Sequence, residues 1–553
     1  MKLTNKYISL AVIPLMLLFT VSCDDFLDIN DDPNNPLVVP IGQLLPSIQV
    51  DISGALGTAS GGLSQYTSTY MHHLVQRGTD SNDYGFAGGD FGVITPWNVF
   101  YARGLQDNEI MMELSRENGA TAYLAIGFIL KAYSFSILVD LYGDVPYSEA
   151  FQGSSNINPV YDLGENIYPD LYTLLDSAVL LIDGLAANPS SFTPSIDDLI
   201  YGGNMNSWRA AAKTIKLKML SQERLIKNVS AEAQALVDEG DLITSAIDFE
   251  LDHGSTVSPD DRNPGWVQEY ASGNPNYYVS PYLFEIMNNI NSFGHNGYTI
   301  ATVDPRLPYY MFNQLPPGAA DGDAENPCAY CPSRSGTSFL SIWAFSFNID
   351  PNEGFDQAVS QTVLGLYYYG GAFDDGSGTG GAGISPALGF PQAPQRFINE
   401  YTRHFIEAEL AQVGVITGDA RASLEAGTRA AFDKVNEYAS GAGAPAIAAA
   451  DIDTYVAAML ADYDGGSADR QLEHIMTQKW LAGFGTGTDL YTDFRRTGLP
   501  ILHDGNTDNL ATTVRAREFP NAFPWPTNSL DLNANAPRQK DIVSQAAKPF
   551  WMP

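Results

Sequence analysis

Cysteine is scarce in this sequence, with three residues in 553. So few cysteines exclude a small disulfide-dense scaffold, and a zinc ribbon is excluded because it needs a second cysteine pair. Cys328 and Cys331 form a Cys-Ala-Tyr-Cys sequence between Pro327 and Pro332, whereas a thioredoxin-type pair follows a strand and starts a helix. We expect a small-loop disulfide between these two cysteines outside the cytoplasm, with free thiols and then a catalytic pair as the alternatives.

Basic residues are also few. The chain has 29 Lys and Arg against 64 Asp and Glu, which gives a formal net charge of -35. A body of this charge repels nucleic-acid phosphates and anionic lipid headgroups, so it argues against both as partners. It favours neutral or cationic ligands at a solvated surface.

Motifs of catalysis and metal binding are lacking. The sequence has no Gly-x-Ser-x-Gly elbow and no His-Glu-x-x-His. The loop Asp374-Asp375-Gly-Ser-Gly is similar to a calcium loop but lacks the alternating oxygen ligands and the closing glutamate, so we expect no metal and no cofactor. We expect a protein that is not an enzyme. A secreted surface hydrolase acting on polysaccharide remains an alternative, because 64 carboxylates will contain some pair at glycosidase separation. A structural surface or adhesion protein is another, although repeated strands are not seen.

Long hydrophobic runs are confined to the start of the chain. Lys2 and Lys6 precede an apolar stretch over residues 7–21, and Cys23 follows directly after small residues. This pattern predicts a signal peptide over residues 1–22 with Cys23 as the lipidated first residue of the mature chain; the alternative is an ordinary signal peptide. Residues 121–139 are apolar but contain Lys131, so we expect a helix buried within the protein.

Helical periodicity divides the rest of the chain. It predicts helices over 43–52, 62–76, 96–116, 120–142, 164–185, 206–227, 280–291, 391–412, 419–438, 447–461 and 468–484. We expect one domain over 23–553: a helical scaffold over about 40–245 and 391–497, a loop-rich insert over about 246–390, and an ordered C-terminal strap over 498–553. The helix pairs resemble tetratricopeptide units, without a clean repeat of about 34 residues.

Aromatic residues gather in and near the irregular segments. Flat rings can stack on the apolar faces of sugars, while amides bind the hydroxyls, so such clusters are candidates for ligand binding. The candidates are Trp97 with Asn98 and Tyr101, Trp266 with Tyr277 and Tyr278, and Trp343. For each ring alone, a place in the core is the alternative, and we expect at least one to face a ligand.

Several stretches, taken in order, resemble the SusD/RagB family of nutrient-binding outer-membrane lipoproteins. The opening Cys23-Asp24-Asp25-Phe26 with its DPNNP-type leader is similar to one branch of that family. The other matching stretches are residues 138–147, Trp208 with the lysine-rich helix after it, 304–307, 407–410, 478–480, 491–498 and the final Phe550-Trp551.

The resemblance implies a mainly α fold with a tetratricopeptide-like scaffold that carries a loop-rich, aromatic-rich ligand face. It also implies a lipid anchor in the outer membrane with exposure at the cell surface, and a SusC-type TonB-dependent transporter as the partner that this protein covers as a lid. Family ligands range from oligosaccharides to peptides. A ligand-stacking aromatic in family members can come from the early helical region, which here contains Trp97.

Overall fold

The structure is a computed structural model. It describes residues 39–59, 61–76, 80–85, 91–189, 192–290, 302–317, 338–345, 357–508 and 513–553. The expected signal peptide, Cys23 and the Cys328–Cys331 pair lie outside these ranges, so they stay predictions.

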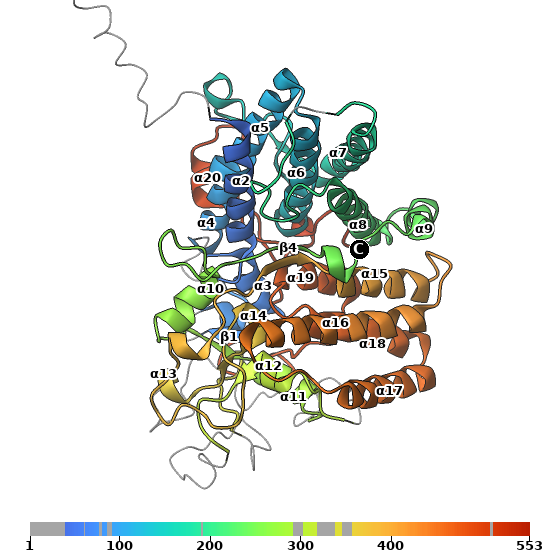
Figure 1. Ribbon diagram of the computed structural model, residues 1–553. Helices are drawn as coiled ribbons and strands as arrows, with labels where there is room; N and C mark the ends of the chain where they lie inside the picture. The colour runs from blue at the N-terminus through green and yellow to red at the C-terminus, as the bar shows by residue number, and fades with distance from the viewer. Residues whose placement is uncertain are drawn as a thin grey trace, which may run out of the picture.

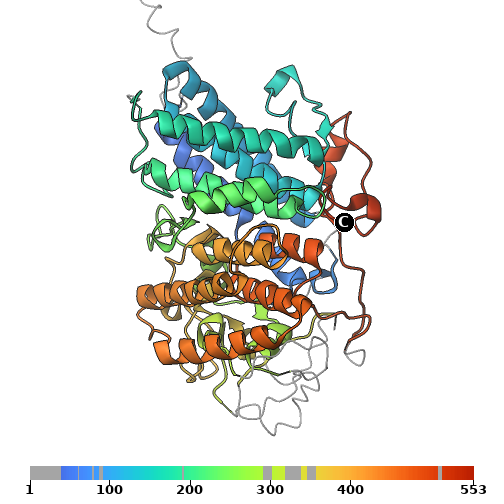
Figure 2. The ribbon, with the colours of Figure 1, turned by 90° about the vertical axis from the view of Figure 1, so that its right-hand side faces the viewer.

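Helices form the scaffold in two stacked groups, one above the other in Figures 1 and 2. The N-terminal group consists of α2 (Ile41–Leu56), α4 (Phe91–Val99), a π-helical turn (Phe100–Gly104), α5 (Leu105–Asn118), α6 (Thr121–Tyr142), α7 (Gly164–Gly184), α8 (Met205–Glu223) and α9 (Ser230–Glu239). The C-terminal group consists of α15 (Glu400–Gln412), α16 (Ala420–Ala442), α17 (Ala449–Gly465), α18 (Ala468–Ala482) and α19 (Gly487–Thr497). Consecutive helices pack side by side in each group, and α8 packs against α15 where the groups meet. The expected mainly α, helical-pair architecture is confirmed.

The most apolar helix lies at the centre of the N-terminal group. Helix α6 is the one helix among the described residues that is long and apolar enough to cross a membrane, and 83% of its apolar window is buried inside the protein. Helices α5, α7 and α8 pack around it. The prediction of a buried core helix is therefore confirmed.

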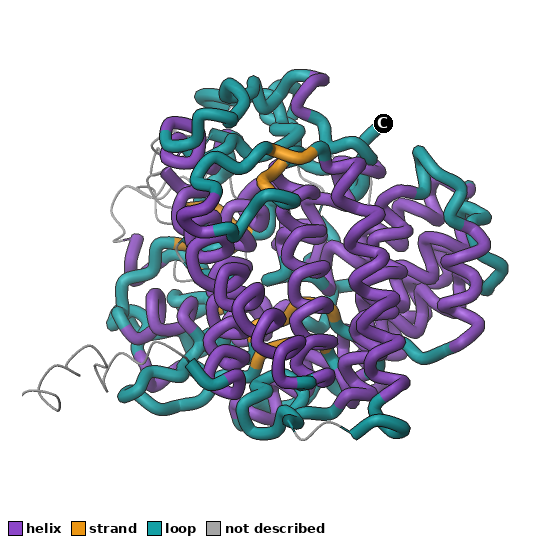
Figure 3. Tube along the Cα trace, turned by 90° about the horizontal axis from the view of Figure 1, so that it is seen from above, coloured by secondary structure: helices purple, strands orange, loops and turns teal. Residues whose placement is uncertain are grey.

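Short elements fill the space between and beside the helix groups. The remaining helices are α3 (Leu63–Tyr70), α10 (Pro264–Trp266), α11 (Pro281–Met287), α12 (Leu307–Tyr310), α13 (Gln357–Ser360), α14 (Leu366–Tyr369) and α20 (Thr527–Asp531). The strands are β1 (Leu74–Gln76), β2 (Val145–Pro146), β3 (Tyr161–Asp162), β4 (Phe249–Leu251), β5 (Tyr277–Val279), β6 (Met311–Phe312), β7 (Val363–Leu364) and β8 (Gln395–Ile398). They pair antiparallel as β1-β5-β7-β6, β2-β3 and β4-β8. Seen from above in Figure 3, most helices lie to the right, while loops gather at the left and top.

Three sequence-based helix predictions need correction. The helix expected over 391–412 begins only at Glu400, because Gln395–Ile398 pairs as β8 with β4. The helix expected over 62–76 ends at Tyr70 and is followed by β1. Pro96, expected in a first turn, lies inside α4. In the first two cases, strand pairing with residues more than a hundred positions away prevails over the local helical periodicity. No local sequence pattern reveals such a pairing.

Candidate functional site

A groove of about 290 Å³ opens between α4, the β2–β3 loop and the C-terminal strap. Its lining residues are Trp97, Tyr101, Gln106, Pro146, Ala150, Phe151, Gln152, Gly153, Asn156, Ile157, Pro159, Asn528, Ser529, Leu532 and Asn533. None of them carries a charge, although the chain as a whole has a net charge of -35.

Aromatic rings form one side of this groove. Trp97 and Tyr101 lie one helical turn apart at the junction of α4 with the π-helical turn, with ring centroids 4.6 Å apart. Tyr161 stacks near Trp97 at 6.5 Å, and Phe151 stacks on Tyr101 at 5.7 Å with an interplanar angle of 22°. Single π-helical turns are often found at functional sites. Trp97 is 4% exposed, while Tyr101 and Phe151 are half-buried. Trp97 therefore lies behind the aromatic side of the groove, and the ring surface that solvent can reach belongs to Tyr101 and Phe151.

Phe151 holds a backbone conformation that bulky residues rarely adopt. Its φ is 63°, in the left-handed region that costs a non-glycine residue about 1–3 kcal/mol. Such strain persists only where the surroundings impose it, and it clusters at ligand-binding sites. The chain just before Phe151 is fixed at the hairpin base, where both Tyr147 N and Ser148 N donate to Asp162 Oδ2, over 3.0 and 2.8 Å.

Amide side chains supply the polar groups of the groove. Asn528 Nδ2 donates to Asn98 Oδ1 over 3.2 Å. Asn528 Oδ1 is buried and has no hydrogen-bond partner among the residues that the structure describes. An unpaired buried acceptor costs about 1–3 kcal/mol, so a ligand hydroxyl or amide that reached this atom would remove that cost. Gln106, Gln152 and Asn156 add further amides to the lining.

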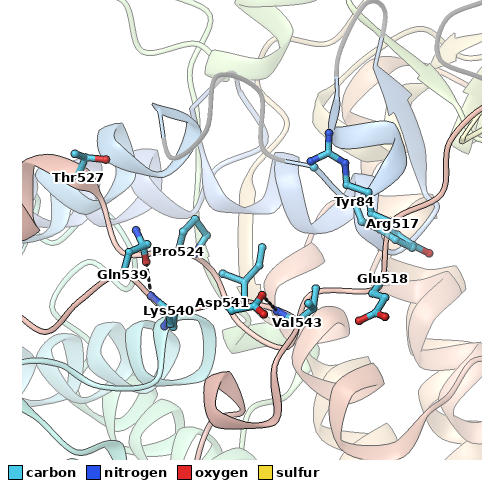
Figure 4. Close-up of a pocket in the computed structure, with 11 residues that line it drawn as sticks. Tyr84, Arg517, Glu518, Pro524, Thr527, Gln539, Lys540, Asp541 and Val543 are labelled. Atoms are coloured by element: carbon cyan, nitrogen blue, oxygen red, sulfur yellow. Dashed lines mark hydrogen bonds between the residues drawn. The ribbon is translucent and has the colours of Figure 1, made fainter.

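A larger pocket of about 620 Å³ lies between Tyr84 and the C-terminal strap. Figure 4 shows that its lining includes Arg517, Glu518, Lys540 and Asp541, two cations and two anions. Its chemistry is therefore unlike that of the groove.

Lys540, which lines the larger pocket, contacts Trp525 of the C-terminal strap. The Lys540 ammonium lies 4.0 Å from the centroid of the Trp525 ring and donates to the carbonyl oxygen of Tyr142. Burial lowers the pKa of Lys540 to about 7, against the raising effect of Asp144. The Tyr161 ring also packs edge-on against the Trp525 ring, with ring centroids 5.7 Å apart.

The structure brings one of the three predicted aromatic clusters to a cavity. Trp97 and Tyr101 line the groove, and the exposed Asn98 contacts a lining residue. The other four predicted rings are buried: Trp266 is 3% exposed, Tyr277 2%, Tyr278 0% and Trp343 2%. These four belong to the core, which corrects their expected exposure to ligand. Their sequence neighbourhood is irregular, but it is covered by packing from both halves of the chain.

Sequence reasoning missed most of the groove. Phe151 and Asn156 belong to the loop between the two-residue strands β2 and β3, and Asn528 and Asn533 lie about 430 residues beyond Trp97 along the chain. The density of Asn in the strap was the one signal available. In the part of the chain that the structure describes, no group of three or more His, Cys, Asp or Glu is arranged to hold a metal.

Comparison with known proteins gives a consistent fold. A SusD-like family model described as "Starch-binding associating with outer membrane" matches residues 33–524. No curated protein sequence matches the chain. Among solved structures, a SusD homologue from Bacteroides fragilis is 20% identical, with a TM-score of 0.66 over 93% of this chain and 99% of its own. A chitin-binding SusD homologue from Flavobacterium johnsoniae is 17% identical, with a TM-score of 0.64 over 92% and 98%. A SusD/RagB family protein from Bacteroides thetaiotaomicron is 17% identical, with a TM-score of 0.62 over 90% and 95%. At these identities the likeness concerns the fold alone.

Proposed function

This chain belongs to the SusD-like family, and on that premise we propose that it captures neutral oligosaccharides at the cell surface by binding them in the groove. It does so without chemistry on the ligand. Cys23 carries the lipid that anchors it in the outer membrane, and a SusC-type TonB-dependent transporter receives the ligand as this protein closes over it like a lid.

The observation that carries the proposal is the uncharged lining of the groove. A sugar presents apolar ring faces and many hydroxyls, and the groove offers Tyr101 and Phe151 for the former and amides for the latter. A peptide ligand with charged side chains would find no partner for them there. The description of the family as starch-binding and the chitin-binding structural relative both support a neutral glycan.

Calorimetric titration tests the binding proposal. Maltoheptaose and chitohexaose are titrated into the unaltered protein and into the variants Tyr101→Ala and Asn528→Ala. We expect binding of at least one oligosaccharide, at least about tenfold weaker for Tyr101→Ala and about fivefold weaker for Asn528→Ala, because the first loses a stacking face and the second a hydrogen bond. Phe192→Ala, which removes an aromatic ring that is 45% exposed and outside the groove lining, is the matched control and should bind as the unaltered protein does. Binding of charged peptides in preference to both sugars would contradict the proposal.

Affinity purification tests the partner. The native lipoprotein is isolated from detergent-solubilised outer membranes, and co-eluting proteins are identified by mass. A stoichiometric β-barrel transporter supports the lid role. Isolation of the lipoprotein without a transporter would refute the lid role. Release of the Cys23→Ala protein from membranes would separately support the lipid anchor.

A further inference from the structure

Two segments far apart in the sequence line the groove together. One is the loop between β2 and β3, which contributes Phe151, Asn156 and Pro159. The other is the strap around α20, which contributes Asn528 and Asn533. Figure 2 shows this loop, in teal, beside the red strap at the upper right. The shape of the groove therefore depends on how the two segments are held to each other.

Hydrogen bonds join the two segments at Asn158. Its Oδ1 accepts from Ala534 N over 2.7 Å, and its carbonyl oxygen accepts from Asn535 Nδ2 over 2.6 Å. Beside it, Asn533 Nδ2 donates to Pro159 O over 2.7 Å. We call these three bonds the cross-groove clasp. Asn158 is not among the lining residues of the groove, whereas Pro159 and Asn533 are.

The clasp is connected to the base of the loop by a chain of polar contacts. Asn158 N donates to Asn156 Oδ1 over 3.0 Å, and Asn156 Nδ2 donates to Glu149 Oε2 over 3.0 Å. The same Glu149 oxygen accepts from Val160 N over 3.1 Å. One carboxylate thus fixes both ends of the segment that carries Asn158. Because these contacts already order the loop, forming the clasp bonds carries little further cost in conformational entropy.

We propose that Asn158 is a positioning residue that sets the width of the groove, and thereby its affinity for oligosaccharide, by tying the loop to the strap. The proposal rests on the proposed function. Asn158 does not line the groove itself. It acts by fixing the positions of Asn533 and Pro159, which do line it. Rings and amides contributed by both segments can engage one sugar chain only while their spacing is fixed, because misplacement of about 1 Å breaks hydrogen-bond geometry.

The experiment compares three variants by calorimetric titration with maltoheptaose and chitohexaose. Asn158→Ala removes the acceptor for Ala534 N, and we expect about fivefold weaker binding, the equivalent of one hydrogen bond. Asn158→Asp keeps an oxygen acceptor in that place and should restore binding to within about twofold. Asn188→Ala changes an exposed asparagine just after α7 and should bind as the unaltered protein does.

The outcomes separate the two claims. Thermal unfolding should be the same for all three variants, because the clasp lies at the surface and the helical core does not depend on it. Equal affinity of Asn158→Ala and the unaltered protein would overturn the positioning role while leaving the proposed function intact. A loss of affinity that Asn158→Asp does not restore would also overturn it. If the unaltered protein binds neither sugar, the proposed function fails and the positioning role fails with it.

Discussion

Replacement of Glu409 by glutamine should remove much of the stability of this protein. Glu409 lies on α15 with its side chain 0% exposed. Its Oε2 accepts from Arg496 Nη2 of α19 over 2.9 Å, and its Oε1 accepts from Arg224 Nε over 2.8 Å, at the end of α8. Arg496 also binds Gln222 and Asp493. One carboxylate thus balances two guanidinium groups where the two helix groups meet.

The magnitude follows from the charge balance. Burial alone would raise the pKa of Glu409, but Arg496 and Arg224 outweigh it and hold the pKa at about 2, below the ordinary 4.5. Because this pKa lies below the ordinary value, the ionised carboxylate is favoured in the folded protein over the unfolded chain. Removing one partner of a buried ion pair typically costs about 3–5 kcal/mol. In this variant Arg224 loses the Glu409 carboxylate while Arg496 keeps Asp493, so the loss should lie near the lower end of that range, about 3 kcal/mol. We expect Glu409→Gln to lower the free energy of unfolding by this amount.

Urea unfolding monitored by circular dichroism at neutral pH measures the loss. The matched control is Glu425→Gln, which breaks an i,i+4 pair with Arg429 whose side chains are 34% and 40% exposed. That change should cost no more than about 0.5 kcal/mol. Equal stability of the two variants would refute the argument that the buried carboxylate joins the two helix groups.

Three further predictions concern the acid stability that Glu409 confers and two packed sites elsewhere in the fold. As pH falls from 4.5 towards 2, the unfolded chain binds a proton at position 409 before the folded chain does, so the unaltered protein should lose stability over this range, and Glu409→Gln should show a flatter acid limb in urea titrations at several pH values. Trp551 is buried and its Nε1 donates to Asp140 Oδ1 over 2.8 Å. In the same assay, Trp551→Ala should lower the free energy of unfolding by about 3–5 kcal/mol and Trp551→Phe by only about 1–2 kcal/mol. Equal losses for the two variants would show that ring burial is not the main contribution. Gly370 has a φ of 86°, and a Cβ there would lie 1.9 Å from Phe390 O, so Gly370→Ala should destabilise the protein by about 2 kcal/mol or more. Gly184 lies in α7 with no atom near its Cβ position, so Gly184→Ala should stabilise the protein by about 0.5–1 kcal/mol. Unchanged stability of Gly370→Ala would contradict the close packing at that turn.

The helices were predictable because their signal is local. The apolar run of α6 and the stripe of Leu472, Ile475 and Met476 on α18 each lie within a single element. The strands were not predictable in the same way. Each of β1 to β8 is two to four residues long, so no alternation develops. Apart from β2 and β3, which pair across 15 to 17 residues, each strand pairs with one more than 50 residues away.

Only the part of the groove formed by one helical segment was predictable, because that part alone has a local signal. Trp97 and Tyr101 lie four residues apart on one helical segment, a spacing that places them on one face. Trp266 and Trp343 have similar sequence surroundings but are buried, because burial depends on what packs over a ring and not on the residues beside it. The strap amides reach the groove through contacts such as Asn528 with Asn98, which span hundreds of residues.

A crystal structure of the protein with bound chitohexaose or maltoheptaose tests the central claim most directly. The account predicts a sugar ring against Tyr101 and Phe151, with a hydroxyl or amide within hydrogen-bond distance of Asn528 Oδ1. Sugar found instead in the larger pocket beside Tyr84 and Arg517, with the groove empty, would contradict it.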